Sequence, residues 1–283
     1  MMQTLRDIVE KGKAFLESRK VLHPKRCIED FLALYFGCSR CDLYMQLEKP
    51  LEEGELVEIR AGVKRLAEHE PLEYVVARQK FYGLDLTVTS KALVPRPETE
   101  IFVDKIVQEI RGTLSSKTAL WDIGTGTGAI GLALKKALPS LCVTISDLSQ
   151  EALALAQSNA NKHALAVRCL QGDLFSAFPK GEKVDILVSN PPYLSEEEYE
   201  GAHPTLLFEP KMALLGGQTG LEFYERFEKE SKPFLKKTSK IFFEIGSQQG
   251  EALCKIFSGS FWKNPRVFLD WARLPRFFFL EIE

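Results

Sequence analysis

The sequence contains no apolar run long enough to cross a lipid bilayer, which takes about 20 consecutive apolar residues. Its apolar stretches, such as Phe31–Phe36 and Phe277–Leu280, are short and typical of a protein core. Residues 1–10 alternate polar and apolar side chains and lack the apolar centre of a secretory signal peptide. We therefore expect a cytoplasmic protein that does not associate with membranes.

The sequence also lacks an excess of either charge. Lys and Arg number 37 and Asp and Glu number 39, so the formal net charge is −2. Proteins that bind nucleic acid without sequence preference rely on a positively charged surface. The near-neutral balance therefore argues against a nucleic-acid substrate.

The six cysteines lack the spacing of a zinc site. Cys38 and Cys41 form one Cys-x-x-Cys pair, with His23 and Cys27 upstream, but no second pair of ligands follows at a short spacing. Disulfides are rare in the cytosol, so the cysteines are expected as thiols. We expect no metal ion.

The pattern of apolar residues divides the chain. Residues 1–75 have apolar side chains at helical spacing and predict a small helical bundle, in which Ser39 and Asp42 form a capping box. Residues 76–92 predict a hairpin linker. Over residues 93–283 strands and helices alternate, which predicts a mainly parallel sheet covered on both faces. The expected strands are residues 119–123, 142–146, 167–170, 184–189, 241–245, 267–269 and 276–280.

A glycine-rich segment, Asp122–Gly128, follows the first of these strands and opens a helix. Glycines let such a turn stay tight and let a ligand approach the backbone. Gly126-x-Gly128-x-x-Gly131 also fits the dinucleotide-binding pattern. However, Asp122 places a carboxylate just before the turn, where it suits the ammonium group of S-adenosylmethionine and not a pyrophosphate. The segment therefore favours S-adenosylmethionine over a nicotinamide cofactor.

Acidic residues follow the next two strands. Asp147 can accept hydrogen bonds from two ribose hydroxyls, which either cofactor would offer. Asp173 can accept from an adenine amino group, and Leu174 can pack on the adenine ring. Alone, Asp173 would be interpreted as a helix cap. Because ligands bind at the carboxyl ends of parallel strands, where these residues lie, we favour the cofactor interpretation.

The fourth strand ends in Asn190-Pro191-Pro192-Tyr193. An amide or exocyclic amine nitrogen has a delocalised lone pair, so a site that methylates it must orient the NH2 group and accept its hydrogens. The Asn190 side-chain oxygen and the Pro191 carbonyl can accept them, Pro192 helps to fix the backbone, and Tyr193 offers a flat face. A simple strand-ending turn is the alternative. With the glycine loop upstream, we predict methyl transfer to a planar nitrogen.

The chain resembles the bacterial and organellar glutamine N5-methyltransferases that modify peptide chain release factors. The resemblance extends over most of the sequence, and its motifs include Glu70–Tyr74, Val94–Glu100, Asp122–Ile130, Gly172–Phe175, Asn190–Tyr193, Glu209–Leu214 and Glu244–Gly250. Asn-Pro-Pro-Tyr is shared with adenine-N6 methyltransferases, whereas Arg-Pro-Glu-Thr-Glu beside a helical N-terminal domain is more specific. At Leu174 some relatives carry Trp, and Ala77 stands where relatives often have glycine.

This resemblance implies a class I S-adenosylmethionine-dependent methyltransferase with a Rossmann-like seven-stranded sheet. It also implies a helical domain that helps to dock the release factor, and a target glutamine within Gly-Gly-Gln. We expect a monomer. The cofactor contacts implied by the family, with those expected from the strand ends, are Gly124, Thr125, Gly126, Thr127, Gly128, Asp147, Asp173, Leu174 and Asn190. The residues implied to hold the glutamine amide are Asn190, Pro191, Pro192 and Tyr193.

Two motifs stay open at this stage. Arg96–Glu100 is either a proline-started helix with acidic residues in its first turn or a direct substrate contact. Gly216–Gln218 repeats the tripeptide that the family methylates. We expect an ordinary glycine turn there, with self-methylation as the alternative.

Three other functions compete with this interpretation. An adenine-N6 nucleic-acid methyltransferase would need a pocket for a flipped base and usually a basic face. A catalytically silent module that docks on the translation machinery would not need an intact glycine loop and Asn190–Tyr193. A nicotinamide-dependent oxidoreductase is the third, and Asp122 argues against it.

Overall fold

The computed structural model describes residues 3–115 and 117–282. The chain forms two compact units, the first comprising Met1–Arg78 with His203–Phe208 and the second Gln79–Ala202 with Glu209–Glu283. Among the described residues, no helix is long and apolar enough to cross a membrane. The two units are described separately.

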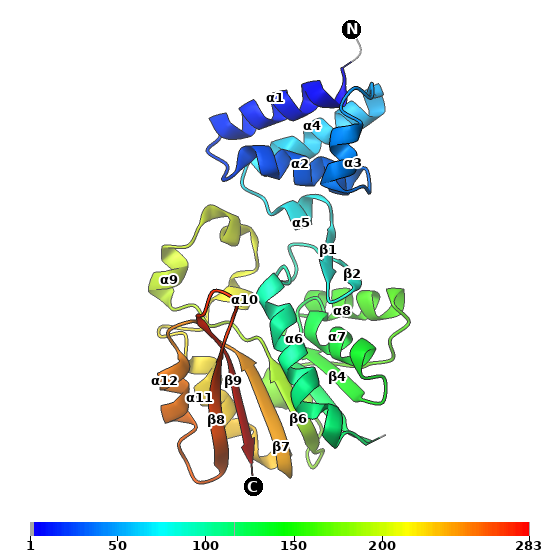
Figure 1. Cartoon of the computed structure of the whole chain (residues 1–283). Coiled ribbons are helices and arrows are strands. Elements are labelled where there is room, and N and C mark those ends of the chain that lie inside the picture. Colours follow the sequence, from blue (N-terminus) through cyan, green and yellow to red (C-terminus); the bar gives the residue numbers. More distant parts are fainter. Residues whose placement is uncertain (1–2, 116, 283) are drawn as a thin grey trace. The chain divides into compact units, whose positions relative to one another are not determined.

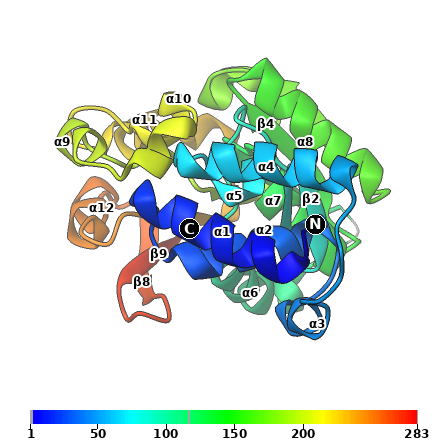
Figure 2. The same cartoon turned by 90° about the horizontal axis from the view of Figure 1, so that it is seen from above.

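The first unit is a bundle of helices in which α1 and α2 run side by side (Figures 1 and 2). The Thr4 side chain accepts from the backbone of Asp7 at the start of α1. The Ser39 hydroxyl and Asp42 form the predicted capping box at the start of α3, which confirms that expectation. The helices of this unit are α1 (Leu5–Ser18), α2 (Pro24–Tyr35), α3 (Arg40–Met45), α4 (Glu53–Ala67) and α5 (Leu72–Val75).

The core of the bundle depends on a close approach between α2 and α4. A methyl group added at Gly62 would lie 2.2 Å from Cζ of Phe31, so only glycine permits this packing. Buried Leu16 and Leu32 complete the same apolar cluster. One carboxylate, Glu29, is also buried and pairs with Arg40 at 2.7 Å. Because this buried carboxylate has a charged partner, it belongs to the structural core of the bundle and does not act as a free acid or base.

At the end of this unit, Ala77 has a left-handed backbone, with φ +52°. Such a conformation costs a residue with a Cβ atom about 1–2 kcal/mol. Glycine at this position would avoid this cost.

The second unit contains a seven-stranded sheet in the order β5-β4-β3-β6-β7-β9-β8. Strands β3 to β7 pair in parallel with one another, whereas β9 is antiparallel to both β7 and β8. The mainly parallel sheet confirms the predicted fold class. A separate two-stranded sheet pairs β1 (Arg78–Phe81) with β2 (Leu84–Thr87). The strands of the large sheet are β3 (Ala119–Ile123), β4 (Cys142–Asp147), β5 (Arg168–Gln171), β6 (Val184–Ser189), β7 (Leu235–Glu244), β8 (Trp262–Leu269) and β9 (Pro275–Ile282).

Helices cover both faces of this sheet (Figure 1). On one face α6 packs on β7 and α7 and α8 pack on β4. On the other face α11, α12 and the short helix η2 enclose an aromatic core around Phe227 and Phe243, whose ring centroids are 4.6 Å apart. The helices of this unit are α6 (Pro97–Ile110), η1 (Arg111–Thr113), α7 (Ala129–Ala137), α8 (Gln150–Lys162), η2 (Leu174–Ala177), α9 (Glu196–Glu200), α10 (Lys211–Leu214), α11 (Glu222–Glu230), η4 (Lys232–Phe234) and α12 (Gly250–Ile256), and η3 (Pro204–Phe208) belongs to the first unit.

Three elements differ from the predicted ranges. Strand β7 starts at Leu235, earlier than expected, because its first residues are mostly polar and carry no apolar signal. Strand β8 starts at Trp262 for the same reason. The apolar pattern predicts a helix over about Leu221–Leu235, whereas α11 ends at Glu230 and Pro233 lies in η4.

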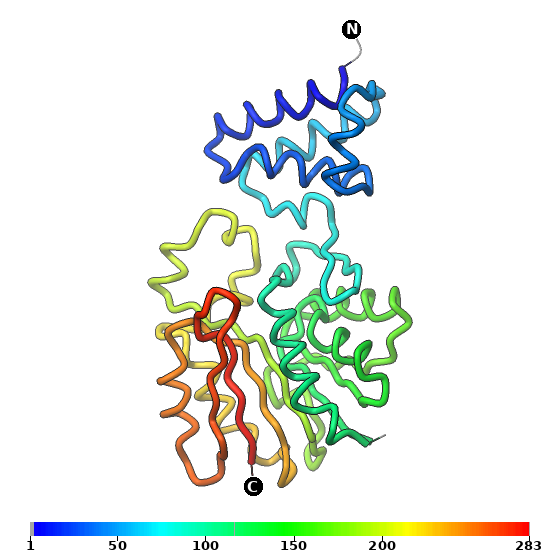
Figure 3. Tube along the Cα trace, viewed as in Figure 1, coloured from blue at the N-terminus to red at the C-terminus, as the bar shows by residue number. Residues whose placement is uncertain are grey.

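The last hairpin, the red end of the tube in Figure 3, turns at the end of the sheet where β7 finishes. Asp270 is almost fully buried at this turn and pairs with Arg276 at 3.2 Å. The Asp270 carboxylate also accepts from the backbone of Leu274 at 3.1 Å. Between them Trp271 is 86% exposed. The turn is therefore fixed from inside while its indole ring faces solvent.

Candidate active site

The carboxyl ends of four parallel strands surround one cavity of about 240 Å³. Strand β3 lies between β4 and β6, so the chain changes direction across the sheet at β3. Open parallel sheets bind ligands at this type of switch point. The cavity is lined by Ile123 from β3, Asp147 from β4, Gly172 after β5 and Asn190 after β6. The fold thus gathers residues that are far apart in sequence, from Lys91 to Arg226.

The glycine loop after β3 depends on left-handed backbone at three glycines. Gly124, Gly126 and Gly128 have φ of +71°, +57° and +85°. The backbone N–H groups of Gly124 and Thr125 both donate to the carbonyl of Ser146, which holds the loop against the end of β4. This conformation needs residues without a Cβ atom, so the glycines are required by the turn itself. Of the five loop residues that were predicted to contact the cofactor, four line the cavity, namely Gly124, Thr125, Gly126 and Thr127, and Gly128 does not.

Asp147 lies in the cavity wall and is held by its neighbours. One carboxylate oxygen accepts from the Gly126 backbone at 2.9 Å, and the other accepts from the Ser149 backbone at 2.8 Å. Burial raises the pKa of Asp147, although these backbone donors act in the opposite direction. Each oxygen has a second lone pair, so the carboxylate can still accept from ligand hydroxyls.

Asp122 differs from its predicted role, because it does not line the cavity. One of its oxygens accepts from the Thr125 hydroxyl at 2.6 Å and from the Gly131 backbone at 2.9 Å. The other is buried without a hydrogen-bond partner among the described residues. Burial raises the pKa of this carboxyl to about 6. The carboxylate therefore faces the first turn of α7, where it stabilises the glycine loop, and its predicted contact with a ligand ammonium group has no counterpart in the cavity wall.

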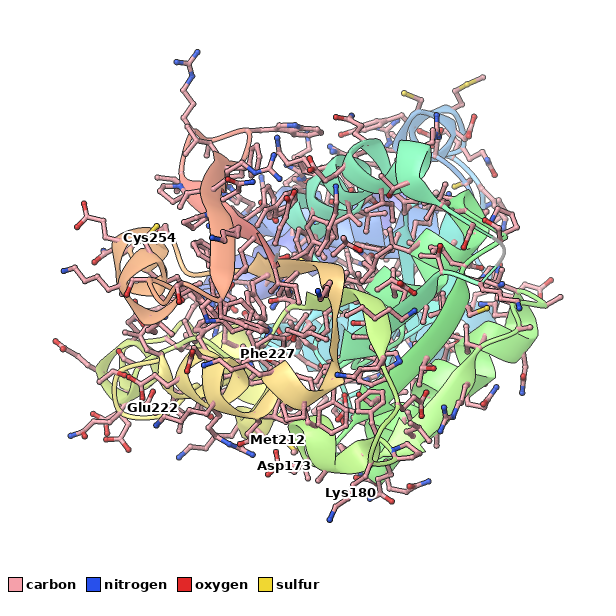
Figure 4. The ribbon with its side chains drawn as sticks, turned by 90° about the horizontal axis from the view of Figure 1, so that it is seen from below. Asp173, Lys180, Met212, Glu222, Phe227 and Cys254 are labelled. Atoms are coloured by element: carbon pink, nitrogen blue, oxygen red, sulfur yellow. The ribbon has the colours of Figure 1, made fainter. Side chains whose placement is uncertain are left out.

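Asp173 and Leu174 both line the cavity, as does Met212, and Asp173 and Met212 are labelled in Figure 4. Leu174 has φ +47°, a backbone conformation that is costly for a residue with a Cβ atom. The Asp173 carboxylate has a partner that the sequence did not reveal, because both of its oxygens accept from the guanidinium of Arg226, at 3.1 and 2.9 Å. Arg226 lies on α11 and also lines the cavity.

The Asn190–Tyr193 segment is divided between the cavity and the protein interior. Asn190 and Pro192 line the cavity, whereas Pro191 and Tyr193 do not. The Asn190 side-chain amide has no hydrogen-bond partner within residues 3–115 and 117–282, so its oxygen is free to accept from a ligand. Burial, with a smaller contribution from the Glu244 carboxylate, raises the pKa of Tyr193 to about 12. Tyr193 therefore supports the segment from inside, and its predicted contact with a planar substrate has no counterpart in the cavity wall.

Close backbone packing holds this segment in place. The Gln249 side chain donates to the Tyr193 carbonyl at 2.9 Å. A methyl group added at Gly216 would lie 2.5 Å from the Pro192 carbonyl oxygen, and one added at Gly220 would lie 2.3 Å from that of Tyr193. Gly216 thus supports Asn190–Tyr193 as a packing residue, as expected for a glycine turn. Gln218 is exposed and does not line the cavity.

The Arg96–Glu100 segment, whose role was left open, and Val94 before it are held beside the cavity by two buried acids. Glu209 is buried, accepts from the Val94 backbone at 3.0 Å and pairs with Arg96. The Thr99 hydroxyl donates to the buried Glu244 carboxylate at 2.7 Å. Arg96 and Thr99 also line the cavity. The segment is therefore both the start of helix α6 and part of the site wall.

The cysteines take no part in this site. All six lie in the described part of the chain and none forms a disulfide, and burial raises the pKa of Cys27 to about 11. Within the described ranges, no group of three or more His, Cys, Asp or Glu side chains has the arrangement of a metal site.

Comparisons with known proteins agree with this division of the chain. Residues 7–76 match the family described as PrmC N-terminal domain, and residues 97–238 match the Methyltransferase small domain. The release factor glutamine methyltransferase of Chlamydia trachomatis serovar D is 39% identical over 278 residues, which cover 98% of this chain and 94% of that protein. The enzyme of the same name from Bacillus subtilis is 39% identical over 82% of this chain and 83% of its own length.

Solved structures support the fold. A methyltransferase from Pyrococcus furiosus superposes with a TM-score of 0.52 at 16% identity and covers 81% of this chain and 98% of that one. The catalytic domain of human Mettl16 superposes with a TM-score of 0.56 at 16% identity, covering 82% of this chain and 81% of that one. At these identities the likeness concerns the fold alone. The sequence relationship is the stronger evidence, and by its identity and its nearly complete coverage this chain belongs to the release factor glutamine methyltransferase family.

Proposed function

We propose that the cavity at the ends of β3 to β6 transfers a methyl group from S-adenosylmethionine to the side-chain amide nitrogen of a glutamine in the Gly-Gly-Gln motif of peptide chain release factors. The observation that carries this proposal is the free side-chain amide of Asn190 in the same cavity as the glycine loop and Asp147. Family membership supplies the reaction type and the class of substrate.

The residues around the cavity fit S-adenosylmethionine. The left-handed glycines give the ligand access to the backbone, and a side chain at Gly124 or Gly126 would strain the loop. Asp147 retains lone pairs for two ribose hydroxyls, and Leu174 offers an apolar surface for the adenine ring. When bound, the cofactor supplies an electrophilic methyl group on a sulfonium.

Asn190 and the backbone that follows it orient the acceptor. The Asn190 oxygen accepts one N–H of the glutamine amide. We assign the other N–H to the Pro191 carbonyl, although Pro191 itself is not among the residues that line the cavity. With both hydrogens held, the nitrogen presents its lone pair to the methyl group, and the two acceptors stabilise the positive charge that develops on the nitrogen until it loses one of its N–H protons to water. Pro192 in the cavity wall and the half-buried Tyr193 hold this backbone at a fixed angle.

The domain assignment belongs to the same proposal. Residues 1–75 form the domain that helps to dock the release factor, residues 76–92 the hairpin linker and residues 93–283 the catalytic domain. The match of residues 7–76 to the family's N-terminal domain supports this division. We propose that the enzyme acts as a cytoplasmic monomer on a protein substrate, without a nucleic-acid substrate.

Methyl transfer from labelled S-adenosylmethionine to a purified release factor, and in parallel to duplex DNA, tests the proposal. We expect label on the Gly-Gly-Gln glutamine only, and Asn190→Ala should lower turnover about 100- to 1,000-fold, by analogy with the loss of one charge-stabilising group. An unchanged melting temperature in that variant would show that its fold is intact. Label on DNA adenine, or a near-normal rate in Asn190→Ala, would refute the assigned substrate or the assigned role.

A further inference from the structure

The partner of Asp173 at the cavity wall is an arginine with every nitrogen of its guanidinium engaged. The two terminal nitrogens of Arg226 donate to the two oxygens of Asp173, at 3.1 and 2.9 Å. The third nitrogen, Nε, donates to Glu230 one turn further along α11, at 3.0 Å. Glu230 on the same helix thus holds Arg226 in place, and Arg226 in turn holds Asp173, the residue just before η2.

This two-point contact fixes the plane of the Asp173 carboxylate. A single hydrogen bond would let the carboxylate rotate about its Cβ–Cγ bond, whereas a paired contact with a planar guanidinium prevents that rotation. Each carboxylate oxygen has two lone pairs and gives one to Arg226. The remaining lone pairs can accept an N–H group from a ligand in the cavity that Asp173 and Arg226 both line.

We propose that Arg226 is a specificity-determining residue, which makes the cofactor site select a purine with an exocyclic amino group over one with an oxo group. This inference rests on the proposed function, in which Asp173 accepts from the adenine amino group. An amino group satisfies the fixed carboxylate, whereas an oxo group would place one acceptor against another. A free aspartate could turn away from the oxo oxygen, but one held by Arg226 cannot. The preference for the amino group therefore comes from the repulsion between the oxo oxygen and the Asp173 carboxylate, which Arg226 holds in place.

Solvent limits how strongly Arg226 can change the preference for adenine over hypoxanthine. The side chains of Arg226 and Asp173 are 46% and 48% exposed, so water screens their attraction. Exposed ion pairs of this kind typically change an equilibrium by a factor of about two to five. We expect the loss of Arg226 to lower the preference for adenine over hypoxanthine by about three- to fivefold.

Calorimetric titration of the full chain with two probes tests this inference. The probes are S-adenosyl-L-homocysteine and S-inosyl-L-homocysteine, which differ only at the exocyclic position and the adjacent ring nitrogen of the purine. The measured quantity is the dissociation constant of S-inosyl-L-homocysteine divided by that of S-adenosyl-L-homocysteine. It is determined for the wild type and for Arg226→Ala, Arg226→Lys, Asp173→Ala and Lys229→Ala. Lys229 is exposed on the same helix, so Lys229→Ala removes one positive charge without touching the pair. Because both probes bind the same protein sample, a general loss of stability does not change the ratio.

We expect Arg226→Ala and Asp173→Ala to lower the ratio, Arg226→Lys to give an intermediate value because lysine cannot form the paired contact, and Lys229→Ala to leave the ratio unchanged. An unchanged ratio in Arg226→Ala together with a lowered ratio in Asp173→Ala would refute the role of Arg226 and keep Asp173 at the adenine. An unchanged ratio in Asp173→Ala would instead overturn the adenine assignment, and the role of Arg226 with it. An equal fall in Lys229→Ala would show a general effect of charge and would also refute the inference.

Discussion

Replacement of Glu244 by glutamine should remove a pH dependence from the stability of the catalytic unit. Glu244 ends β7, is fully enclosed and accepts from the Thr99 hydroxyl at 2.7 Å. Burial raises its pKa from an ordinary 4.5 to about 7. The charged and titratable groups that face it are Arg276 on β9, Tyr193 after β6, Tyr224 on α11, and Arg96 and Glu98 at the start of α6.

The sign follows from proton binding. In the folded protein Glu244 holds its proton up to a pH of about 7, whereas in the unfolded chain it loses the proton near 4.5. The folded state binds more protons in this window, so the free energy of unfolding falls as the pH rises through it. A displacement of this size corresponds to a loss of about 2 kcal/mol between pH ~5.5 and pH ~8. For a unit of this length, that loss lowers the melting temperature by roughly 4–8 °C.

Thermal unfolding of wild type and Glu244→Gln at several pH values measures the effect. Glutamine can still accept from Thr99 but carries no charge at any pH, so the variant should gain stability relative to wild type as the pH rises. Asp122, whose pKa burial also raises, contributes equally to both proteins and cancels in the comparison. Glu225→Gln removes an exposed carboxylate on α11 and serves as the matched control. Parallel stability curves for wild type and Glu244→Gln would refute the reasoning.

Two further substitutions test the site. Asp147→Ala should weaken cofactor binding by about ten- to 100-fold, because it removes the ribose acceptor and the anchor of the Gly126 backbone, and calorimetry with S-adenosylhomocysteine measures this. Unchanged affinity would contradict the ribose assignment. Gly220→Ala should destabilise the fold by about 1–2 kcal/mol or more and reduce turnover, because φ is +76° and the new methyl would meet the Tyr193 carbonyl. Gly112→Ala, where nothing lies within 4 Å, is its control, and equal melting temperatures for the two variants would contradict the packing argument.

The sequence was informative where a side chain's role follows from its place on a strand. The apolar runs that end at Ile123 and Ser189 predicted where the glycine loop and Asn190–Tyr193 lie. They did so because parallel strands bring their carboxyl ends together. Strand β7 was predicted too short, since the polar residues at its start give no such pattern.

Contacts between distant side chains were not accessible in this way. Arg226 lies 53 positions from Asp173, and nothing in the spacing of an exposed helix indicates which residue its guanidinium meets. Glu209 and Arg96 were singled out only as parts of family motifs, and their pairing needed the folded chain. The direction of Asp122 depends on a hydrogen bond to the Gly131 backbone, which a sequence pattern does not encode.

The three tryptophans give this protein a built-in optical probe. Trp121 lies on β3, the strand that leads into the glycine loop, and is buried. Its ring stacks on that of Phe178 with centroids 3.7 Å apart, and Trp262 is also buried. Trp271, at the tip of the last hairpin, is in water. Its fluorescence should be red-shifted and accessible to a collisional quencher such as iodide, whereas emission from the two buried indoles should be blue-shifted and protected. Arg276 pairs with Asp270 in the hairpin and also acts on the Tyr193 hydroxyl. The fraction of the fluorescence that iodide quenches therefore reports on the hairpin beside Asn190–Tyr193 without any attached dye.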